Sequence, residues 1–244
     1  MNSPAPCSAR AMRQLTLDVR PTVQPTLANF VIGPNQAMVA ALRRQIAATD
    51  GSWLYLWGRP GTGRSHLLQA IVSESLTSGR SSAYMSAEPS GDWLLEQGQL
   101  IALDDIEQLD AAGQAALFRA LIQAREARAT LILAGNMPPQ QLPLREDVRT
   151  RIGQALVFEI QALSDADKGI LLIEHASARG MRLEADIVEY LLRHGHRDQA
   201  WLMSVLDALD DVSLSQARPI TLPLLREILC DDSEPDLPDE AQQA

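Results

Sequence analysis

This sequence lacks several features that mark common protein classes. It contains only two cysteines, Cys7 and Cys230, which lie near the chain ends and show no metal-ligand or redox spacing. No apolar run approaches the ~18 residues that span a bilayer, and no secretory signal is visible at the N-terminus. These absences argue against a membrane protein and favour a reduced, cytoplasmic compartment.

An excess of positive charge is also missing. The chain has 31 acidic and 21 basic residues, which gives a net charge of −10. Because duplex affinity comes largely from neutralising phosphates, we expect no strong direct DNA binding. Part of the acidity lies at residues 231–244, beside two prolines. This segment is predicted to be a disordered tail, with an interaction tail as the alternative.

The chain does contain a clear change of periodicity near residue 160. Before it, short apolar runs alternate with helical patterns, which predicts a parallel α/β sheet sandwiched by helices. The expected strands are 53–57, 82–86, 100–104, 130–134 and 156–160. The expected helices are one opened by Pro34, then 65–78, 111–127 and, more weakly, 139–148.

After residue 160 only helical patterns follow, at 165–179, 184–193, 199–214 and 222–229, which predicts a small all-α domain. Ser164 is the expected N-cap of the first of these helices, and Gly180 is expected to end it. We therefore predict a flexible arm over 1–26, an α/β domain over 27–162, a helical domain over 163–230 and the tail over 231–244.

A phosphate-binding loop is the strongest local signal. Residues 58–65, GRPGTGRS, match the Walker A spacing GxxxxGK[ST], except that Arg64 replaces lysine. Backbone N–H groups of such a loop and the following helix end bind the phosphates of ATP or ADP. Arginine is bulkier than lysine and forked, so diphosphate binding should survive while γ-phosphate placement is less secure. The expected binding residues are Gly58, Pro60, Gly61, Thr62, Gly63, Arg64, Ser65 and His66.

Two acids and an amide follow the next strands. Asp104 and Asp105 end an apolar run about 40 residues after the loop, as in a Walker B motif. Asp104, with the Ser65 hydroxyl, is predicted to hold Mg²⁺, and Asp105 to orient the attacking water. Asn136 follows the run 130–134 and has two interpretations. It senses the γ-phosphate, or it caps the turn that Met137 begins.

With these motifs in place, the chain resembles the Hda family of DnaA-related AAA+ regulators over nearly its whole length. The matching segments are LANFVIGPNQAMVAAL, GRSHLL, LDDIEQL and DVRTRIGQ. DnaA itself continues into a basic DNA-binding domain, whereas here ITLPLLREIL precedes the acidic tail. The resemblance implies an AAA+ fold with a helical lid, and an adenine pocket lined by Phe30, Val31 and Ile32. The alternative is that these three residues belong to the core.

The resemblance also implies a catalytic residue that acts on a partner. Arg151 aligns with the arginine finger, which stabilises transition-state charge at the nucleotide of an adjacent protomer. Arg149 is its near neighbour. The alternative for Arg151 is a surface ion pair with Glu146 or Asp147.

Two further segments acquire meaning from the resemblance. Gln14, Leu15 and Leu17 are similar to a peptide that binds the DNA polymerase sliding clamp, although Asp18 stands where many such peptides have proline. A plain linker is the alternative. In the last domain, Ala200 occupies the place of the second sensor arginine, and Arg197, one turn earlier, is the candidate substitute.

Together these features favour a negative regulator of replication initiation. It binds ADP or ATP with Mg²⁺, docks on the sliding clamp and stimulates ATP hydrolysis by DnaA. Arg64 and Ala200 predict weak or absent hydrolysis by the chain itself. A loader that acts on DNA or a helicase, and an adaptor without nucleotide function, are the competing hypotheses. Homo-oligomerisation stays open, and the four histidines form no metal set.

Overall fold

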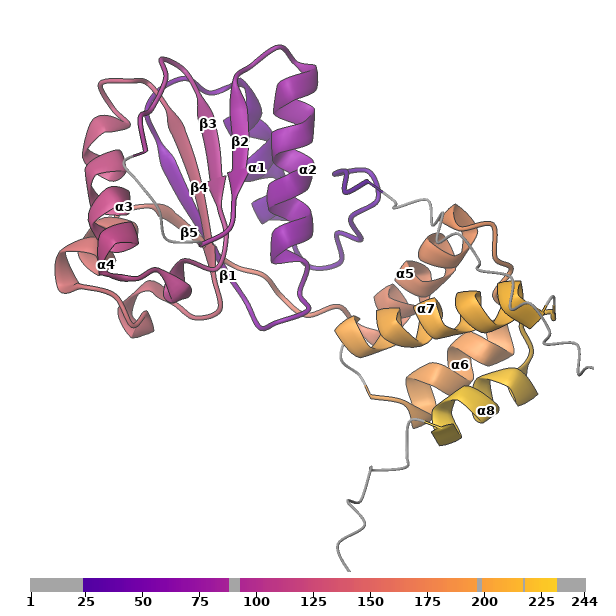
Figure 1. The fold of residues 1–244 in the computed structure, drawn as a ribbon. Coiled ribbons are helices and arrows are strands. Elements are labelled where there is room, and N and C mark those ends of the chain that lie inside the picture. The colour runs from indigo at the N-terminus through magenta and orange to yellow at the C-terminus, as the bar shows by residue number, and fades with distance from the viewer. Residues whose placement is uncertain (1–23, 88–92, 197–198, 217, 232–244) are drawn as a thin grey trace, which may run out of the picture.

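The computed structural model describes residues 24–87, 93–196, 199–216 and 218–231 (Figure 1). The predicted clamp-binding peptide at Gln14, Leu15 and Leu17, the acidic tail after residue 231 and Arg197 lie outside these residues. The first part of the described chain is a five-stranded parallel sheet with strand order β2-β3-β4-β1-β5. Its strands are β1 (Trp53–Trp57), β2 (Ser82–Met85), β3 (Leu100–Leu103), β4 (Thr130–Gly135) and β5 (Leu156–Glu159).

The strand register brings the predicted motifs to one edge of the sheet. Trp57 pairs with Gly135, and Leu103 pairs with Leu133. The residues that follow these strands are Gly58 after β1, Asp104 after β3 and Asn136 after β4. Ligands bind beyond the carboxyl ends of strands in open α/β sheets, so this edge is where a nucleotide is expected.

Helices cover both faces of the sheet, because alternate residues of each buried strand point to opposite sides. On one side α1 (Gln36–Ala47) and α2 (Arg64–Thr77) pack on Leu54, Leu56 and Ala102. On the other side α3 (Ala111–Gln123) and α4 (Glu146–Ile152) pack on residues such as Trp53 and Leu103. Figure 1 shows the two layers on either side of the sheet. The predicted sandwich of helices and parallel strands is confirmed.

A helical lid follows the sheet and has its own apolar core. It consists of α5 (Asp165–Ala178), α6 (Ala185–His194), α7 (Gln199–Gln216) and α8 (Leu222–Asp231). Leu172, Leu191, Leu209 and Leu224 are fully buried between these helices. Ser164 and Asp167 form a reciprocal capping box at the start of α5, as the sequence predicts. None of the described helices is long and apolar enough to cross a membrane.

The prediction of one helix over 139–148 is wrong. The structure has a single 3-10 turn at Pro139–Gln141, and α4 begins only at Glu146. Pro143 accounts for the break, because proline lacks an N–H group and disfavours helical backbone in the residue before it. Two smaller differences are that α1 begins at Gln36 rather than Pro34, and that α3 ends at Gln123.

Candidate functional site

The loop between β1 and α2 has the backbone geometry of a phosphate cradle. Gly61 and Gly63 have φ of 79° and 88°, a left-handed conformation that glycine adopts without steric cost. A Cβ atom on Gly63 would also lie 3.1 Å from Phe30 Cε2. The Thr62 hydroxyl donates to the Arg59 carbonyl at 2.8 Å and closes the turn. The loop therefore leaves its later N–H groups and the start of α2 open toward a ligand.

The predicted magnesium ligands lie at the same edge of the sheet. Asp104 is fully buried at the end of β3, and its Oδ1 accepts from the Asp105 N–H at 2.9 Å. Its Oδ2 accepts from the Tyr84 hydroxyl at 3.1 Å. Burial raises the pKa of Tyr84, and Asp104 adds to the rise, while Gln69 and Ser65 oppose it. Tyr84 therefore supports the predicted Mg²⁺ ligand Asp104 from the neighbouring strand, a role the sequence did not indicate.

The residues at this edge of the sheet suit a cation such as Mg²⁺ whose remaining ligands are phosphate and water oxygens. Among the described residues, no cluster of three or more His, Cys, Asp or Glu side chains could hold a metal by itself. Mg²⁺ usually takes one or two protein oxygens and fills its octahedron with water and phosphate oxygens. One buried carboxylate, Asp104, and one exposed hydroxyl, Ser65, suit that arrangement.

Arg64 is held by two acids. Its Nη2 lies 3.3 Å from Asp105 Oδ1, and its Nη1 lies 3.7 Å from Glu107 Oε1. Burial raises the pKa of Asp105, and Asp104 adds to the rise while Arg64 opposes it. Glu107 was not among the predicted site residues, because its role arises only when the turn after β3 meets the start of α2. The guanidinium thus bridges the phosphate loop and the acidic turn.

Three buried polar atoms at this edge of the sheet have no hydrogen-bond partner among the described residues. They are Arg64 Nη1, Glu107 Oε2 and Asn136 Oδ1. Buried polar atoms are normally paired, so such a group of unpaired atoms indicates a missing ligand, ion or water. Asn136 Oδ1 accepts no hydrogen bond from the described residues, which disagrees with the interpretation of Asn136 as a turn cap. Asn136 directly follows Gly135, where an added Cβ would lie 3.0 Å from Glu107 Oε2, so it lies at the same edge of the sheet.

An apolar cavity lies between the phosphate loop and the lid. Phe30, Val31, Gly63 and His66 line one side of it, and lid residues that include His175 line the other. The Phe30 and His66 rings are 5.9 Å apart at their centroids. The Asn35 side chain makes two hydrogen bonds, of 2.8 and 3.1 Å, with the backbone of Gln161, which lies just after β5. These bonds connect the segment before α1, which lines the cavity, to the end of the sheet. Ile32 packs against the core instead.

The two histidines that line the cavity have lowered pKa values. Burial lowers the pKa of His66, although its hydrogen bond with the Thr26 carbonyl at 3.1 Å opposes the shift. Burial also lowers the pKa of His175, and the nearby charge of Arg179 adds to the effect. Both rings are therefore neutral near pH 7, which suits a site for an aromatic base.

A second hollow adjoins the first half of the phosphate loop. Arg59, Pro60, Gly61 and Thr62 form its loop side. Its lid side includes Gln199 at the start of α7 and Lys168 on α5. Lys168 was not predicted as a site residue, since the sequence drew attention to the start of α7 for a lid cation. The side chain of Ala200 and the whole of Arg197 lie outside what the structure describes.

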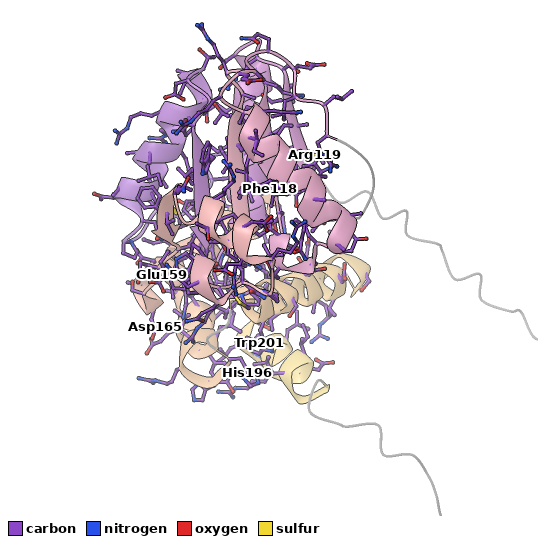
Figure 2. The ribbon with its side chains drawn as sticks, turned by 90° about the vertical axis from the view of Figure 1, so that its left-hand side faces the viewer. Phe118, Arg119, Glu159, Asp165, His196 and Trp201 are labelled. Atoms are coloured by element: carbon purple, nitrogen blue, oxygen red, sulfur yellow. The ribbon has the colours of Figure 1, made fainter. Side chains whose placement is uncertain are left out.

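Arg151 lies apart from the chain's own nucleotide edge. It is on α4, and its guanidinium carbon is 5.1 Å from the centre of the Phe118 ring on α3. Figure 2 shows Phe118 on the face that α3 and α4 cover. Asp147 pairs with Arg145 at 2.7 Å, and within the described residues Arg151 makes no ion pair with Glu146 or Asp147. The ion-pair alternative for Arg151 is therefore not what the structure shows.

Arg149 and Arg151 open onto different hollows of the surface. Arg151 lines one with Phe118 and Asp147, whereas Arg149 lines another with Pro139 and Gln140. The Trp53 indole N–H donates to the Arg151 carbonyl at 3.2 Å and fixes this backbone to the core. Two arginines that lie so close together in α4 therefore offer separable tests of a finger role.

Comparison with known proteins gives one family match and many structural ones. Residues 165–229 match the family model for the lid domain of Hda. Domain III of the Thermotoga maritima replication initiation protein DnaA superposes with a TM-score of 0.72 at 15% identity, covering 87% of this chain and 98% of that one. The AMPPCP-bound DnaA of Aquifex aeolicus gives 0.66 at 20% identity, covering 86% and 70%. The RuvB Holliday junction branch migration motor of Thermotoga maritima gives 0.66 at 18% identity, covering 87% and 72%.

Proposed function

We propose that this chain, whose residues 165–229 match the Hda lid-domain model and whose fold is similar to that of DnaA domain III, binds an adenine nucleotide and regulates replication initiation by acting on DnaA. In this proposal Arg151 is a finger that reaches the nucleotide of a DnaA protomer. The observation that carries it is the placement of Arg151 over Phe118, at 5.1 Å and without a carboxylate partner among the described residues. A guanidinium held by an aromatic ring is positioned but keeps its charge for a phosphate.

The geometry of the loop supports nucleotide binding by the chain itself. Gly61 and Gly63 shape the phosphate cradle, and Phe30, Val31 and His66 line the adjoining cavity. Ser65 and Asp104 would hold Mg²⁺ with the phosphates. An AMPPCP-bound DnaA has the same fold, which agrees with this part of the proposal. The nucleotide would stabilise the protein by joining sheet and lid, as any ligand specific to the native state does.

The chain's own hydrolysis is proposed to be weak. Arg64 contacts both Asp105 and Glu107, so the acid that would orient the attacking water is already paired with a guanidinium. The same contacts draw the loop's cation away from a terminal phosphate. A bound nucleotide would then act as a structural ligand, while catalysis is directed to the partner through Arg151.

Clamp binding through Gln14, Leu15 and Leu17 completes the proposal. These residues precede the described structure, so their support is the sequence pattern and its place ahead of the α/β domain. Docking on the DNA-loaded clamp would raise the local concentration of Arg151 near DnaA on the same DNA.

The decisive experiment measures phosphate release from ATP-loaded DnaA with clamp-loaded DNA present. Addition of this protein should stimulate release, and Arg151→Ala should remove about 10³-fold or more of that stimulation, the contribution typical of a finger supplied in trans. Arg149→Ala is the matched control, since it removes an equal charge from the same helix but from a different hollow.

Each other outcome points elsewhere. Stimulation lost with Arg149→Ala but kept with Arg151→Ala would assign the finger to Arg149. No stimulation by the unaltered protein would reject the regulator hypothesis. A DNA-dependent ATPase of its own would then favour the loader, and failure to bind ADP or ATP would favour the adaptor.

A further inference from the structure

The chain's single lysine is buried next to the phosphate loop. Lys168 is the only lysine among 244 residues, and arginine supplies the other 20 of the 21 basic side chains. Its side chain is only 11% exposed, although it lies in the first turn of a surface helix. Lysine is almost never buried unless it is paired, so its position requires an explanation.

The contact with Asp165 does not provide that explanation. Lys168 Nζ is 3.6 Å from Asp165 Oδ1, which is beyond hydrogen-bonding distance, and the Asp165 side chain is 49% exposed. Figure 2 shows Asp165 at the outside of the lid, on the same side as Glu159. A pair with one solvated partner contributes little to stability. The low exposure of the Lys168 side chain is therefore explained by its place in the wall of the hollow beside the phosphate loop.

That hollow places Lys168 opposite the phosphate loop. Arg59, Pro60, Gly61 and Thr62 line it from the loop, and Lys168 and Gln199 line it from the lid. Gln199 immediately precedes Ala200, the position where the resemblance places a phosphate-sensing arginine. The start of α7 thus faces the loop but has no charge at residue 200, while α5 places an ammonium in the same hollow.

We propose that Lys168 is the phosphate-binding cation of the lid. It would bind the diphosphate of a nucleotide held by the loop, exchanging its exposed partner Asp165 for phosphate oxygens. Lysine suits this role because its ammonium is a compact point charge with three donors. The cation is then supplied by α5 instead of α7, and the lid is tied to the nucleotide through its first helix. This inference rests on the proposed nucleotide binding.

A chain with one lysine permits a direct test by chemical labelling. An amine-reactive acetylating reagent can modify only Lys168 and the N-terminal amine, which mass spectrometry distinguishes. Saturating ADP should slow acetylation of Lys168 by about tenfold or more, while the N-terminal amine reacts unchanged. Saturating adenosine should protect far less, because it lacks the diphosphate. Equal protection by ADP and adenosine would overturn the phosphate contact.

Binding measurements give a second readout that is independent of activity. Lys168→Met keeps the apolar stem that packs in the hollow and removes the charge. This variant should bind ADP about tenfold or more weakly, the loss expected for a charge-assisted hydrogen bond, and should bind adenosine with unchanged affinity. Lys168→Arg should restore much of the loss. The matched control is Arg182→Ala, whose side chain is 89% exposed in the same lid and should alter neither ligand.

The outcomes separate this inference from the function on which it rests. If the unaltered protein binds ADP and Lys168→Met binds it equally well, Lys168 is not a phosphate ligand, and the nucleotide-binding proposal stands. If the unaltered protein binds neither ADP nor adenosine, both proposals fail. A thermal melt followed by circular dichroism checks that each variant is folded.

Discussion

Arg64 is the residue at which the phosphate loop departs from its usual pattern, and the sequence shows only that arginine replaces lysine there. The structure shows what the larger side chain does, which is to contact Asp105 and Glu107 at 3.3 and 3.7 Å. A forked guanidinium can contact two acids at once, whereas a lysine ammonium on a flexible stem is free to follow a phosphate. The replacement of lysine by Arg64 therefore changes both the cation of the loop and the surroundings of Asp105.

Arg64→Lys should increase the chain's own ATP hydrolysis. We expect a gain of about tenfold, equivalent to about 1.4 kcal/mol of the barrier. The reason is that Asp105 is released to orient water while the new ammonium contacts the terminal phosphate. Phosphate release by the isolated chain is the measurement, and Arg182→Lys, a change at a lid side chain that is 89% exposed, is the control. Unchanged or lower hydrolysis would contradict the neutralising role of Arg64.

Among the structural elements, the loop before α2 is where backbone conformation matters most. Gly63 has φ of 88° and lies against the Phe30 ring, so it joins the phosphate cradle to the wall of the base cavity. Gly79, at the other end of α2, has φ of 83°, but a Cβ atom there would meet nothing within 4 Å. The two glycines bear the same backbone strain on substitution and differ only in what surrounds them.

Gly63→Ala and Gly79→Ala form a matched pair. Each should lower the free energy of unfolding by about 1–2 kcal/mol, the cost of a left-handed conformation for a residue with a Cβ. Only Gly63→Ala should also lower the affinity for ADP, by about tenfold or more, because the added methyl group displaces Phe30 and the loop. Urea titration gives the stabilities, and calorimetric titration gives the affinities. Equal affinities in the two variants would show that the loop tolerates the change.

At the scale of the whole molecule, two histidines lie in the cavity between the sheet domain and the lid, and their protonation makes stability depend on pH. His66 on α2 and His175 on α5 line the same cavity, and burial lowers the pKa of both. A histidine whose pKa is lowered on folding binds fewer protons in the native state than in the unfolded chain. Stability then increases with pH in that window. The contribution is complete above the ordinary pKa of 6.5 and is lost as the pH falls through the lowered values.

The unfolding free energy should accordingly fall between about pH 7.5 and about pH 5.5, the range in which histidine titrates. His66→Gln combined with His175→Gln should flatten this dependence, since neither glutamine acquires a charge. His194→Gln is the control, because His194 is an exposed lid residue stacked on Tyr190, away from the cavity. Urea unfolding at several pH values provides the test. An unchanged slope in the double variant would assign the pH dependence to other groups.

The whole molecule also separates two surfaces that the sequence gives only as motifs. The cavities beside the phosphate loop are lined by the loop, the segment before α1 and the lid. The hollow at Arg151 is lined by α3 and α4, on the opposite face of the sheet from α1 and α2. The proposed regulation requires a nucleotide site and Arg151 on separate surfaces of one chain, and these two surfaces are separate.

Local sequence patterns were sufficient to predict the architecture and the strand, glycine-rich loop and helix at residues 53–77. These patterns are apolar runs of strand length, helical periodicity, and glycines at fixed spacing around residues 58–65. Strand positions agree within about a residue, because each apolar run is followed by polar or glycine residues. The helix over 139–148 failed where Pro143 competed with a weak periodicity.

Which side chains meet at the site depends on the tertiary structure. Tyr84 reaches Asp104 from a neighbouring strand, Glu107 reaches Arg64 from the turn after β3, and Lys168 reaches the loop's hollow from the lid. None of these contacts leaves a periodic trace in the sequence, because each joins residues brought together by the sheet order or by the docking of the lid. Charge neutralisation and burial depend on such neighbours, so the chemistry of the site follows from the fold rather than from the motifs alone.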